Sequence, residues 1–169
     1  PYQETDPVDP KTVYGESKAA GEKAVAETTP KHFIVRTAWL YGDGNNFVKT
    51  MLELAAKHPQ LTVVNDQVGS PTSTVDLAAA IIDLIETDHY GIYHGTCEGQ
   101  CSWYDFALES FRLSGIDIPV AAVTSEQFVR PAPRPKYSVL ENKALNDLKM
   151  NNFRPWQLSL AEYLENLNK

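Results

Sequence analysis

Tyr14 and Lys18, in the stretch TVYGESKAAGEKAV, are the residues whose types and spacing most directly suggest catalysis. On a helix, side chains four residues apart lie on one face. An ammonium beside a phenol favours the phenolate, so Tyr14 can exchange a proton with a carbonyl or alcohol oxygen. Lys18 can also hydrogen-bond a ribose hydroxyl, and the small Gly15, Ser17 and Ala19 would let a flat ligand lie close. The pair alone is more often a polar stripe on a surface helix, so its surroundings must decide.

Alternating helices and strands must position this pair. The first ten residues are rich in Pro and acids and predict a loop, and a helix over 11–28 follows, ended by Pro30. Short β-branched or apolar runs predict the strands, which lie within 32–42 and at 61–66, 91–96 and 119–123. Two short helices are expected near 141–149 and 157–168. Strands that alternate with helices are typical of an α/β fold with parallel strands.

Capping residues and apolar spacing define the other helices. Asn45 or Asn46 is expected to cap a helix that places Phe47, Met51, Leu54 and Ala55 on one face. GSPTS, residues 69–73, reads as a loop. Capping boxes are expected at Ser73/Asp76, Ser102/Asp105 and Ser159/Glu162. Two apolar stripes follow the first two boxes, namely Leu77, Ile81, Leu84 and Ile85, and Trp103, Phe106 and Ala107.

Composition excludes several classes of function. The chain has 169 residues, 43% of them hydrophobic and 22% charged, which is ordinary for one globular domain. A net charge of −7 argues against binding along a nucleic-acid backbone, which needs a basic face. No apolar run approaches the roughly 20 residues of a membrane span. We therefore expect no nucleic-acid partner, no membrane insertion and a cytoplasmic location.

The cysteines and histidines do not form a metal-binding pattern. Cys97 and Cys101 are separated by three residues, with no second Cys or His pair in zinc-like spacing. They are expected to be free thiols in a reducing compartment. The histidines are scattered, and none belongs to an H-x-x-x-H motif: they are His32, His58, His89 and His94. No metal ligand is therefore assigned.

GDGNNF, residues 42–47, imitates the glycine fingerprint of dinucleotide-binding proteins. It follows a predicted strand and precedes a helix, and Asp66 lies about 20 residues further on, where a ribose-binding acid is expected. The third glycine of that fingerprint lets helix and strand pack closely, and here the position is Phe47. We therefore reject this loop as a pyrophosphate site, and no other glycine group comes nearer to the pattern.

Several blocks resemble a known enzyme family. Y-x-x-x-K followed by small residues and Glu22 resembles the extended short-chain dehydrogenase/reductase superfamily. RTAWLYG, GNNFVKTML, VVNDQVGSPT and RPKYSVL then follow in order. With PYQETDPVDPKTVYGESKAAGE they are similar to the dTDP-4-dehydrorhamnose reductase family, over residues 1 to about 140. The R-T-x-W and N-D-Q-x-G blocks are more specific than Y-x-x-x-K.

The resemblance implies a role for each matching residue. Tyr14 would donate a proton to the C4 ketone oxygen of the sugar while NADPH delivers hydride, and Lys18 would tune Tyr14 and hold the nicotinamide ribose. Trp39 would pack against the deoxysugar ring, as an indole suits its apolar face. Asn46, Gln67 and Arg134 are candidates for the nucleotide end, where a guanidinium can bind two diphosphate oxygens. The alternative interpretations without a function are a core tryptophan at Trp39, a solvated loop arginine at Arg134, and an ordinary strand and turn at VVNDQ.

The resemblance also implies the place of the chain in a larger reductase. The family's glycine loop and its substrate-polarising Ser or Thr precede the Tyr/Lys helix and are not in this sequence. We therefore expect an α/β chain that is the C-terminal portion of a Rossmann-type parallel sheet with a small α/β substrate-binding region. Residues 1–45 would end the Rossmann part, and residues 46–169 would form mainly the substrate-binding region, with returning Rossmann elements. Such a fragment alone is expected to be inactive.

Partners and cofactor follow from the same resemblance. It implies a dTDP-sugar substrate and NADPH, with NADH open because the discriminating loop is not in this sequence. A homodimer is open as well; some family members pair through Mg²⁺, and no residues here demand it. The alternatives are another nucleotide-sugar epimerase or dehydratase of the superfamily, or a non-catalytic regulatory subunit resembling that of methionine adenosyltransferase. Tyr14, Lys18 and Trp39 together favour the reductase.

Overall fold

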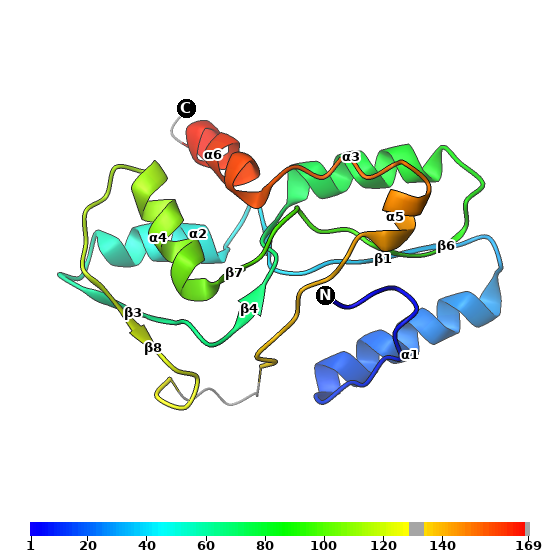
Figure 1. Ribbon diagram of the computed structural model, residues 1–169, viewed down its shortest axis with the longest axis horizontal. Coiled ribbons are helices and arrows are strands. Elements are labelled where there is room, and N and C mark those ends of the chain that lie inside the picture. Colours follow the sequence, from blue (N-terminus) through cyan, green and yellow to red (C-terminus); the bar gives the residue numbers. More distant parts are fainter. Residues whose placement is uncertain (129–133, 168–169) are drawn as a thin grey trace.

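A parallel pair of strands with a helix on each side forms one half of the molecule, the α1 half (Figure 1). The computed structural model describes residues 1–128 and 134–167. Helix α1 (Val13–Thr28) leads into strand β1 (Phe33–Arg36), and helix α3 (Thr74–Ile85) leads into strand β6 (Gly91–His94). β1 and β6 pair in parallel from Phe33↔Gly91 to Arg36↔His94. The short helix α5 (Lys143–Asp147) packs on β6.

A second parallel pair organises the other half, the α4 half (Figure 1). Helix α2 (Phe47–Ala55) is followed by strand β3 (Leu61–Val64), and helix α4 (Trp103–Leu113) by strand β8 (Val120–Val123). β3 and β8 pair in parallel, and α4 packs against β3 with the buried Ala107 and Phe111. The expected α/β fold with parallel strands is confirmed.

Short strand pairs and the last helix join the two halves. β2 (Leu40–Tyr41) pairs in parallel with β5 (Thr72–Ser73), and β4 (Val68–Gly69) pairs antiparallel with β7 (Cys101–Ser102). Residues 69–73, expected to be a loop, therefore contribute to two short strands. Helix α6 (Trp156–Leu167) packs on β5 and α4. The main core lies at this junction and includes Tyr41, Val48, Leu84, Phe106, Leu145, Trp156 and Leu160.

Several predicted helix starts are confirmed. Thr12 caps α1, accepting a hydrogen bond from Gly15 N at 3.1 Å. Asn46 caps α2 by accepting from Lys49 N. Ser102 and Asp105 form the expected capping box of α4, in which each side chain accepts from the other residue's backbone N–H. These starts hold because side-chain oxygens there satisfy amides that lack a partner within the helix.

Two predicted capping boxes are wrong. Ser73 caps α3 through Val75 N, but the Asp76 carboxylate bonds to Arg154 rather than to the cap. Ser159 lies inside α6, and Glu162 also pairs with Arg154. In the first case Arg154, 78 residues away in sequence, takes the carboxylate that the local pattern assigned to the helix end. In the second case the helix begins before Ser159, so this residue cannot cap it.

The apolar stripe of α3 is only partly buried. Leu84 is buried and Leu77 packs against the core as predicted, but Ile81 and Ile85 are exposed. Ala80 takes part in the packing instead. Helical periodicity identified the helix correctly but assigned two exposed residues, Ile81 and Ile85, to its buried face.

The first residues are held against a segment near residue 140. Tyr2 forms a parallel bridge with Leu140, and Tyr2 N donates to Val139 O at 2.9 Å. The Glu4 carboxylate accepts from His94 N at 3.0 Å and from Ala144 N at 3.1 Å. The opening segment, expected to be a loop, is thus tied to β6 and α5.

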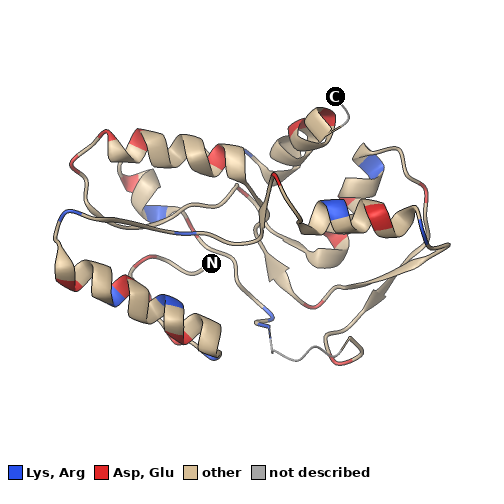
Figure 2. Cartoon of the chain, turned by 180° about the vertical axis from the view of Figure 1, so that it is seen from behind, with Lys and Arg blue, Asp and Glu red and all other residues tan. Residues whose placement is uncertain are grey.

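Charged side chains of both signs are mixed over the surface. Figure 2 shows Lys and Arg interspersed with Asp and Glu on helices of both halves. Within residues 1–128 and 134–167, no helix is both long and apolar enough to cross a membrane. The same residues bring together no group of three or more His, Cys, Asp or Glu that could hold a metal ion.

Candidate active site

Tyr14 and Lys18 lie on the exposed surface of α1, near its first turn. Tyr14 is 74% exposed, and α1 buries none of its residues. Figure 1 shows that α1 and β1 run in opposite directions, so the first turn of α1 lies toward the end at which β1 finishes. That is the carboxyl edge of the parallel pair, where ligands bind in open α/β sheets. None of the described residues forms an ion pair with Lys18.

One ion pair holds this helix on the sheet. Arg36, the last residue of β1, donates from Nε to Glu22 Oε1 at 3.0 Å and from Nη2 to Glu22 Oε2 at 2.6 Å. The two side chains are 19% and 24% exposed. Such a paired fork fixes orientation as well as distance. Glu22, one turn beyond Lys18, therefore positions the Tyr14–Lys18 face.

Trp39 lies just beyond the carboxyl end of β1 in an uncommon backbone conformation. Its φ is 48°, in the left-handed region that bulky residues rarely adopt. Thr72 N donates to Trp39 O at 3.1 Å, which holds this turn against β5. Its indole stacks on that of Trp103 with centroids 3.6 Å apart and planes 9° apart. One face of Trp39 is therefore covered by Trp103.

The other face of Trp39 lies against the backbone of Gly69. A Cβ added at Gly69 would lie 2.7 Å from Trp39 Cζ2 and Nε1, and closer still to Cε2, the atom bonded to both. Because the added Cβ would be nearer to Cε2 than to either of its bonded neighbours, it would lie above the plane of the indole rather than beside its edge. Gly69 therefore allows a close approach that any side chain would block. Trp39 is enclosed between a glycine backbone and a second indole.

A cavity of about 890 Å³ adjoins this stack in the α4 half. α2 and β3 form much of its wall, and Trp103, Gln67 and Arg134 line it as well. Phe47 and Phe128 add aromatic surface. Mostly apolar walls with a few polar groups are typical of ligand sites, and this volume suits a drug-sized molecule. The structure thus brings together two sequence-predicted residues, Gln67 and Arg134, on one cavity.

Polar contacts order the cavity wall around Gln67. Gln67 Nε2 donates to Ser125 Oγ at 2.8 Å, and Ser125 Oγ donates to Asp66 Oδ1 at 2.7 Å. The hydrogen bond from Ser125 holds the pKa of Asp66 below its ordinary value. Lys136 Nζ lies 3.9 Å from the same carboxylate. The N-D-Q block is therefore tied to the segment after β8.

Asn46 has a different setting from the other predicted ligand residues. Its Oδ1 caps α2, while Nδ2 donates to Gly42 O at 2.7 Å and to Tyr163 Oη at 2.8 Å. It is not among the residues that line the cavity. These hydrogen bonds tie the start of α2 to Gly42 and to Tyr163 of α6.

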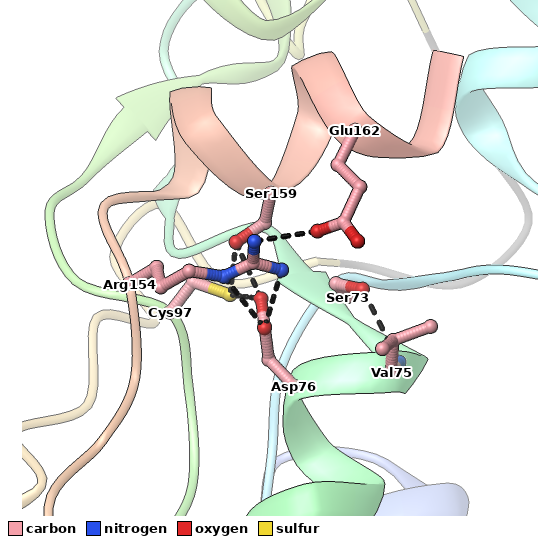
Figure 3. A network of polar contacts seen from close by, with 7 residues as sticks. All are labelled: Ser73, Val75, Asp76, Cys97, Arg154, Ser159 and Glu162. Carbon is pink, nitrogen blue, oxygen red and sulfur yellow. Dashed lines mark hydrogen bonds and ion pairs between the residues drawn. The ribbon is translucent and has the colours of Figure 1, made fainter. Parts of the chain in front are cut away.

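Asp76 is the centre of a polar network that the sequence did not reveal (Figure 3). Its Oδ1 accepts from Arg154 Nε at 2.9 Å and Nη2 at 2.6 Å. Oδ2 accepts from Ser159 Oγ and from Cys97 Sγ. Arg154 Nη1 also lies 2.5 Å from Glu162 Oε2. The network joins α3, α6 and the segment between them.

Burial dominates the chemistry of the thiols. Cys97 and Cys101 are both free and buried. Loss of solvation raises the pKa of Cys97 to about 11 and also raises that of Cys101. Neither thiol is therefore an activated nucleophile, which would need a lowered pKa.

Sequence similarity assigns the chain to a family. Residues 1–169 match the model of the RmlD substrate binding domain. The chain belongs to the RmlD substrate binding domain family. This RmlD-type chain is 47% identical to the spore coat polysaccharide biosynthesis protein SpsK of Bacillus subtilis, over 98% of its own length and 58% of that relative. It is 40% identical to the dTDP-4-dehydrorhamnose reductase of Escherichia coli, over 99% of its length and 60% of that enzyme.

Solved structures agree with this assignment. A dTDP-4-dehydrorhamnose reductase from Clostridium acetobutylicum matches with a TM-score of 0.98 and 54% identity, over 100% of this chain and 60% of that one. A reductase of the same name from Bacillus anthracis, in complex with NADP, matches with a TM-score of 0.95 and 41% identity, over 98% and 59%. The RmlD-type chain thus spans about three fifths of these relatives. An NAD complex of a dTDP-glucose 4,6-dehydratase, 16% identical, shares the fold.

Proposed function

We propose that these residues form the substrate side of an NADPH-dependent reductase that converts dTDP-4-dehydro-L-rhamnose to dTDP-L-rhamnose. One arrangement carries the proposal. The exposed Tyr14–Lys18 face and Trp39 lie at the carboxyl edge of β1, and Trp39 is joined through Trp103 to the cavity that Gln67 and Arg134 line. The names of the relatives supply the substrate and the place in cell-surface polysaccharide synthesis.

In this proposal Tyr14 and Lys18 carry the proton chemistry. The Tyr14 hydroxyl donates its proton to the C4 ketone oxygen as that carbon accepts hydride, so the ketone becomes an alcohol. The Lys18 ammonium stabilises the phenolate left on Tyr14, because an opposite charge nearby favours the ionised form. Their exposure and the absence of an ion pair to Lys18 among the described residues leave both groups available to a ligand.

The nucleotide end of the substrate would occupy the cavity. The Arg134 guanidinium suits two diphosphate oxygens, and the Gln67 amide suits a polar group of the base or sugar. Asn46 would act indirectly, because it caps α2 and α2 forms part of the cavity wall. Trp39 would contact the deoxysugar.

The cofactor fits the residues present only in part. NADPH, when bound, supplies the hydride, and Tyr14 and Lys18 are placed to hydrogen-bond its nicotinamide ribose. The loop at 42–47 has Phe47 where a pyrophosphate-binding loop has its third glycine, so we propose that the cofactor's pyrophosphate is held by other residues. We propose that residues 1–45 belong to the cofactor-binding part and residues 46–169 mainly to the substrate-binding part. A cytoplasmic location and a homodimer remain part of the proposal.

Ligand preference tests this function. Calorimetric titration of the chain should show binding of dTDP-L-rhamnose and weaker or no binding of UDP-glucose and GDP-mannose. Arg134→Ala should weaken dTDP-L-rhamnose binding by about tenfold, the usual worth of a charge-assisted pair. Binding of UDP- or GDP-sugars in preference to dTDP-sugars would instead indicate an epimerase or dehydratase. Oxidation of NADPH by dTDP-4-dehydro-L-rhamnose, measured in a polypeptide that adds a cofactor-binding part, tests the reaction itself.

A further inference from the structure

We propose that Trp103 is a displaceable cover on the ring face of Trp39 that the sugar needs, and that the sugar end of a dTDP-sugar opens the Trp39–Trp103 stack. The inference rests on the proposed function, since it takes Trp39 as a sugar contact. It goes further by assigning a role to Trp103 and by describing how Trp39 is covered when no ligand is bound. In that state, the indole surface available for a sugar is already occupied.

The two covers of Trp39 differ in how they can move. Gly69 belongs to β4, and its register with Cys101 of β7 fixes its backbone. It presents no side chain that could rotate away from the ring. Trp103 covers the opposite face with an indole, and a side chain can change rotamer. Only the Trp103 face can therefore open without breaking the β4–β7 pairing.

The backbone of Trp103 is itself held firmly. It is the first residue of α4 and directly follows Ser102, whose capping box with Asp105 is complete. Motion must therefore occur in the Trp103 side chain. The 890 Å³ cavity that Trp103 lines provides space next to this side chain. Phe47, with its ring centroid 4.6 Å from that of Trp103, supplies an aromatic surface for the displaced indole.

The backbone of Trp39 supports a functional reading of this stack. A bulky residue at a φ of 48° is strained, and such strain persists where the surroundings impose it. Here the Thr72 hydrogen bond and the Gly69 contact hold Trp39 in one place. A rigid Trp39 and a rotatable Trp103 are what an exchange of stacking partners requires.

Fluorine NMR of 5-fluorotryptophan-labelled protein tests the exchange directly. The resonance of each indole is identified by its loss in Trp39→Phe, Trp103→Phe and Trp156→Phe. Saturation with dTDP-L-rhamnose is expected to shift the Trp39 resonance, because the ring current of Trp103 is lost. Saturation with dTDP alone should shift the Trp103 resonance, on the cavity wall, and leave that of Trp39 in place. A Trp39 resonance that does not move with bound dTDP-L-rhamnose would overturn the inference.

Affinity gives an independent readout. Trp103→Leu removes the competing indole, so it should tighten binding of dTDP-L-rhamnose by about three- to tenfold, the scale of one aromatic stack. Trp103→Phe leaves a smaller aromatic ring over Trp39, so its affinity for dTDP-L-rhamnose should lie between those of wild type and Trp103→Leu. Weaker or unchanged dTDP-L-rhamnose binding in Trp103→Leu would refute the cover and leave the proposed function standing. A wild-type chain that binds neither ligand would refute both.

Discussion

The carboxylate of Glu22 and the guanidinium of Arg36 join α1 to β1 through hydrogen bonds of 2.6–3.1 Å. Because α1 buries none of its residues, this pair is the principal polar anchor of the helix that presents Tyr14 and Lys18. Arg36 also donates to Glu4 O at 3.4 Å. The proposed catalytic pair, on an exposed helix, thus depends for its placement on one partly buried ion pair.

Loss of this anchor should release α1. Glu22→Gln leaves Arg36 without a carboxylate, so we expect the free energy of unfolding to fall by about 2 kcal/mol. Amide hydrogen exchange in 13–28 should accelerate more than in α3. Glu27→Gln is the matched control on the same helix, because its pair with Lys23 is exposed and should contribute under about 0.5 kcal/mol. Equal effects of the two variants in urea denaturation would contradict the anchor role.

The Asp76 network should matter more for stability than for binding. Asp76→Asn removes the charge that faces Arg154 and is expected to cost about 3 kcal/mol, since the carboxylate side chain is only 10% exposed. The affinity of the variant for dTDP-L-rhamnose should stay within about threefold of wild type under conditions where it is folded. Asp83→Asn, exposed on the same helix, is the control in thermal denaturation. A loss of affinity without a loss of stability would place Asp76 in the ligand site.

Stability should fall in alkali. Burial raises the pKa of Cys97 to about 11 and raises those of Cys101 and Tyr41 as well. The unfolded chain loses these protons first, so it binds fewer protons and stability falls as pH rises. For Cys97 the loss runs from about pH 9 to about pH 11, at up to about 1.4 kcal/mol per pH unit. Urea denaturation at a series of pH values from 7 to 11 measures the free energy of unfolding. This free energy should fall less steeply with pH for Cys97→Ala than for wild type, and an equal dependence on pH would exclude Cys97 as a source of the effect.

Two glycine substitutions should act in opposite directions. A Cβ at Gly69 would collide with Trp39, so Gly69→Ala should lower stability by about 1–3 kcal/mol and alter the fluorescence of Trp39. Gly21 lies within α1 and a Cβ there meets nothing within 4 Å. Gly21→Ala should therefore raise stability by up to about 1 kcal/mol. Thermal denaturation compares the two, and a harmless Gly69→Ala would contradict the close approach.

Tyr14→Phe tests the proposed role of Tyr14 as the proton donor. It removes only the hydroxyl, so turnover of the complete reductase should fall by about 10²–10⁴-fold, with dTDP-L-rhamnose affinity changed by less than about threefold. Tyr90→Phe, which removes an exposed hydroxyl bonded to Asp88, should leave the rate unchanged. NADPH oxidation in the steady state measures both. Full activity of Tyr14→Phe would favour a non-catalytic binding subunit.

Local patterns predicted most of the elements. The helix at 11–28, the Asn46 cap and the Ser102–Asp105 box depend on neighbouring residues, so the sequence contains what forms them. Ser73/Asp76 failed because Arg154, 78 residues away in sequence, takes the Asp76 carboxylate. Ser159/Glu162 failed because α6 begins at Trp156, before Ser159. A charge partner brought in by the tertiary fold cannot be read from helical spacing.

The residues of the candidate site could be proposed from the sequence, but the contacts between them could not. Spacing identified Tyr14 and Lys18, and the resemblance added Trp39, Gln67 and Arg134. Nothing in the sequence indicated that Trp103 would stack on Trp39, because the apolar stripe of Trp103, Phe106 and Ala107 is typical of core packing. The close approach of Gly69 likewise depends on a strand pairing that no local pattern reveals.

The hydrogen bonds between the first residues and the segment near residue 140 have a consequence for synthesis on the ribosome. Glu4 accepts from Ala144 N across 140 positions, and Gln3 donates to Glu141 across 138. Such distant contacts form late, because the long intervening loop must close first. The segment that leads into α1 is made early and must wait for its final partners until residue 144 leaves the exit tunnel. A nascent chain halted before that point should therefore expose its opening segment to proteolysis.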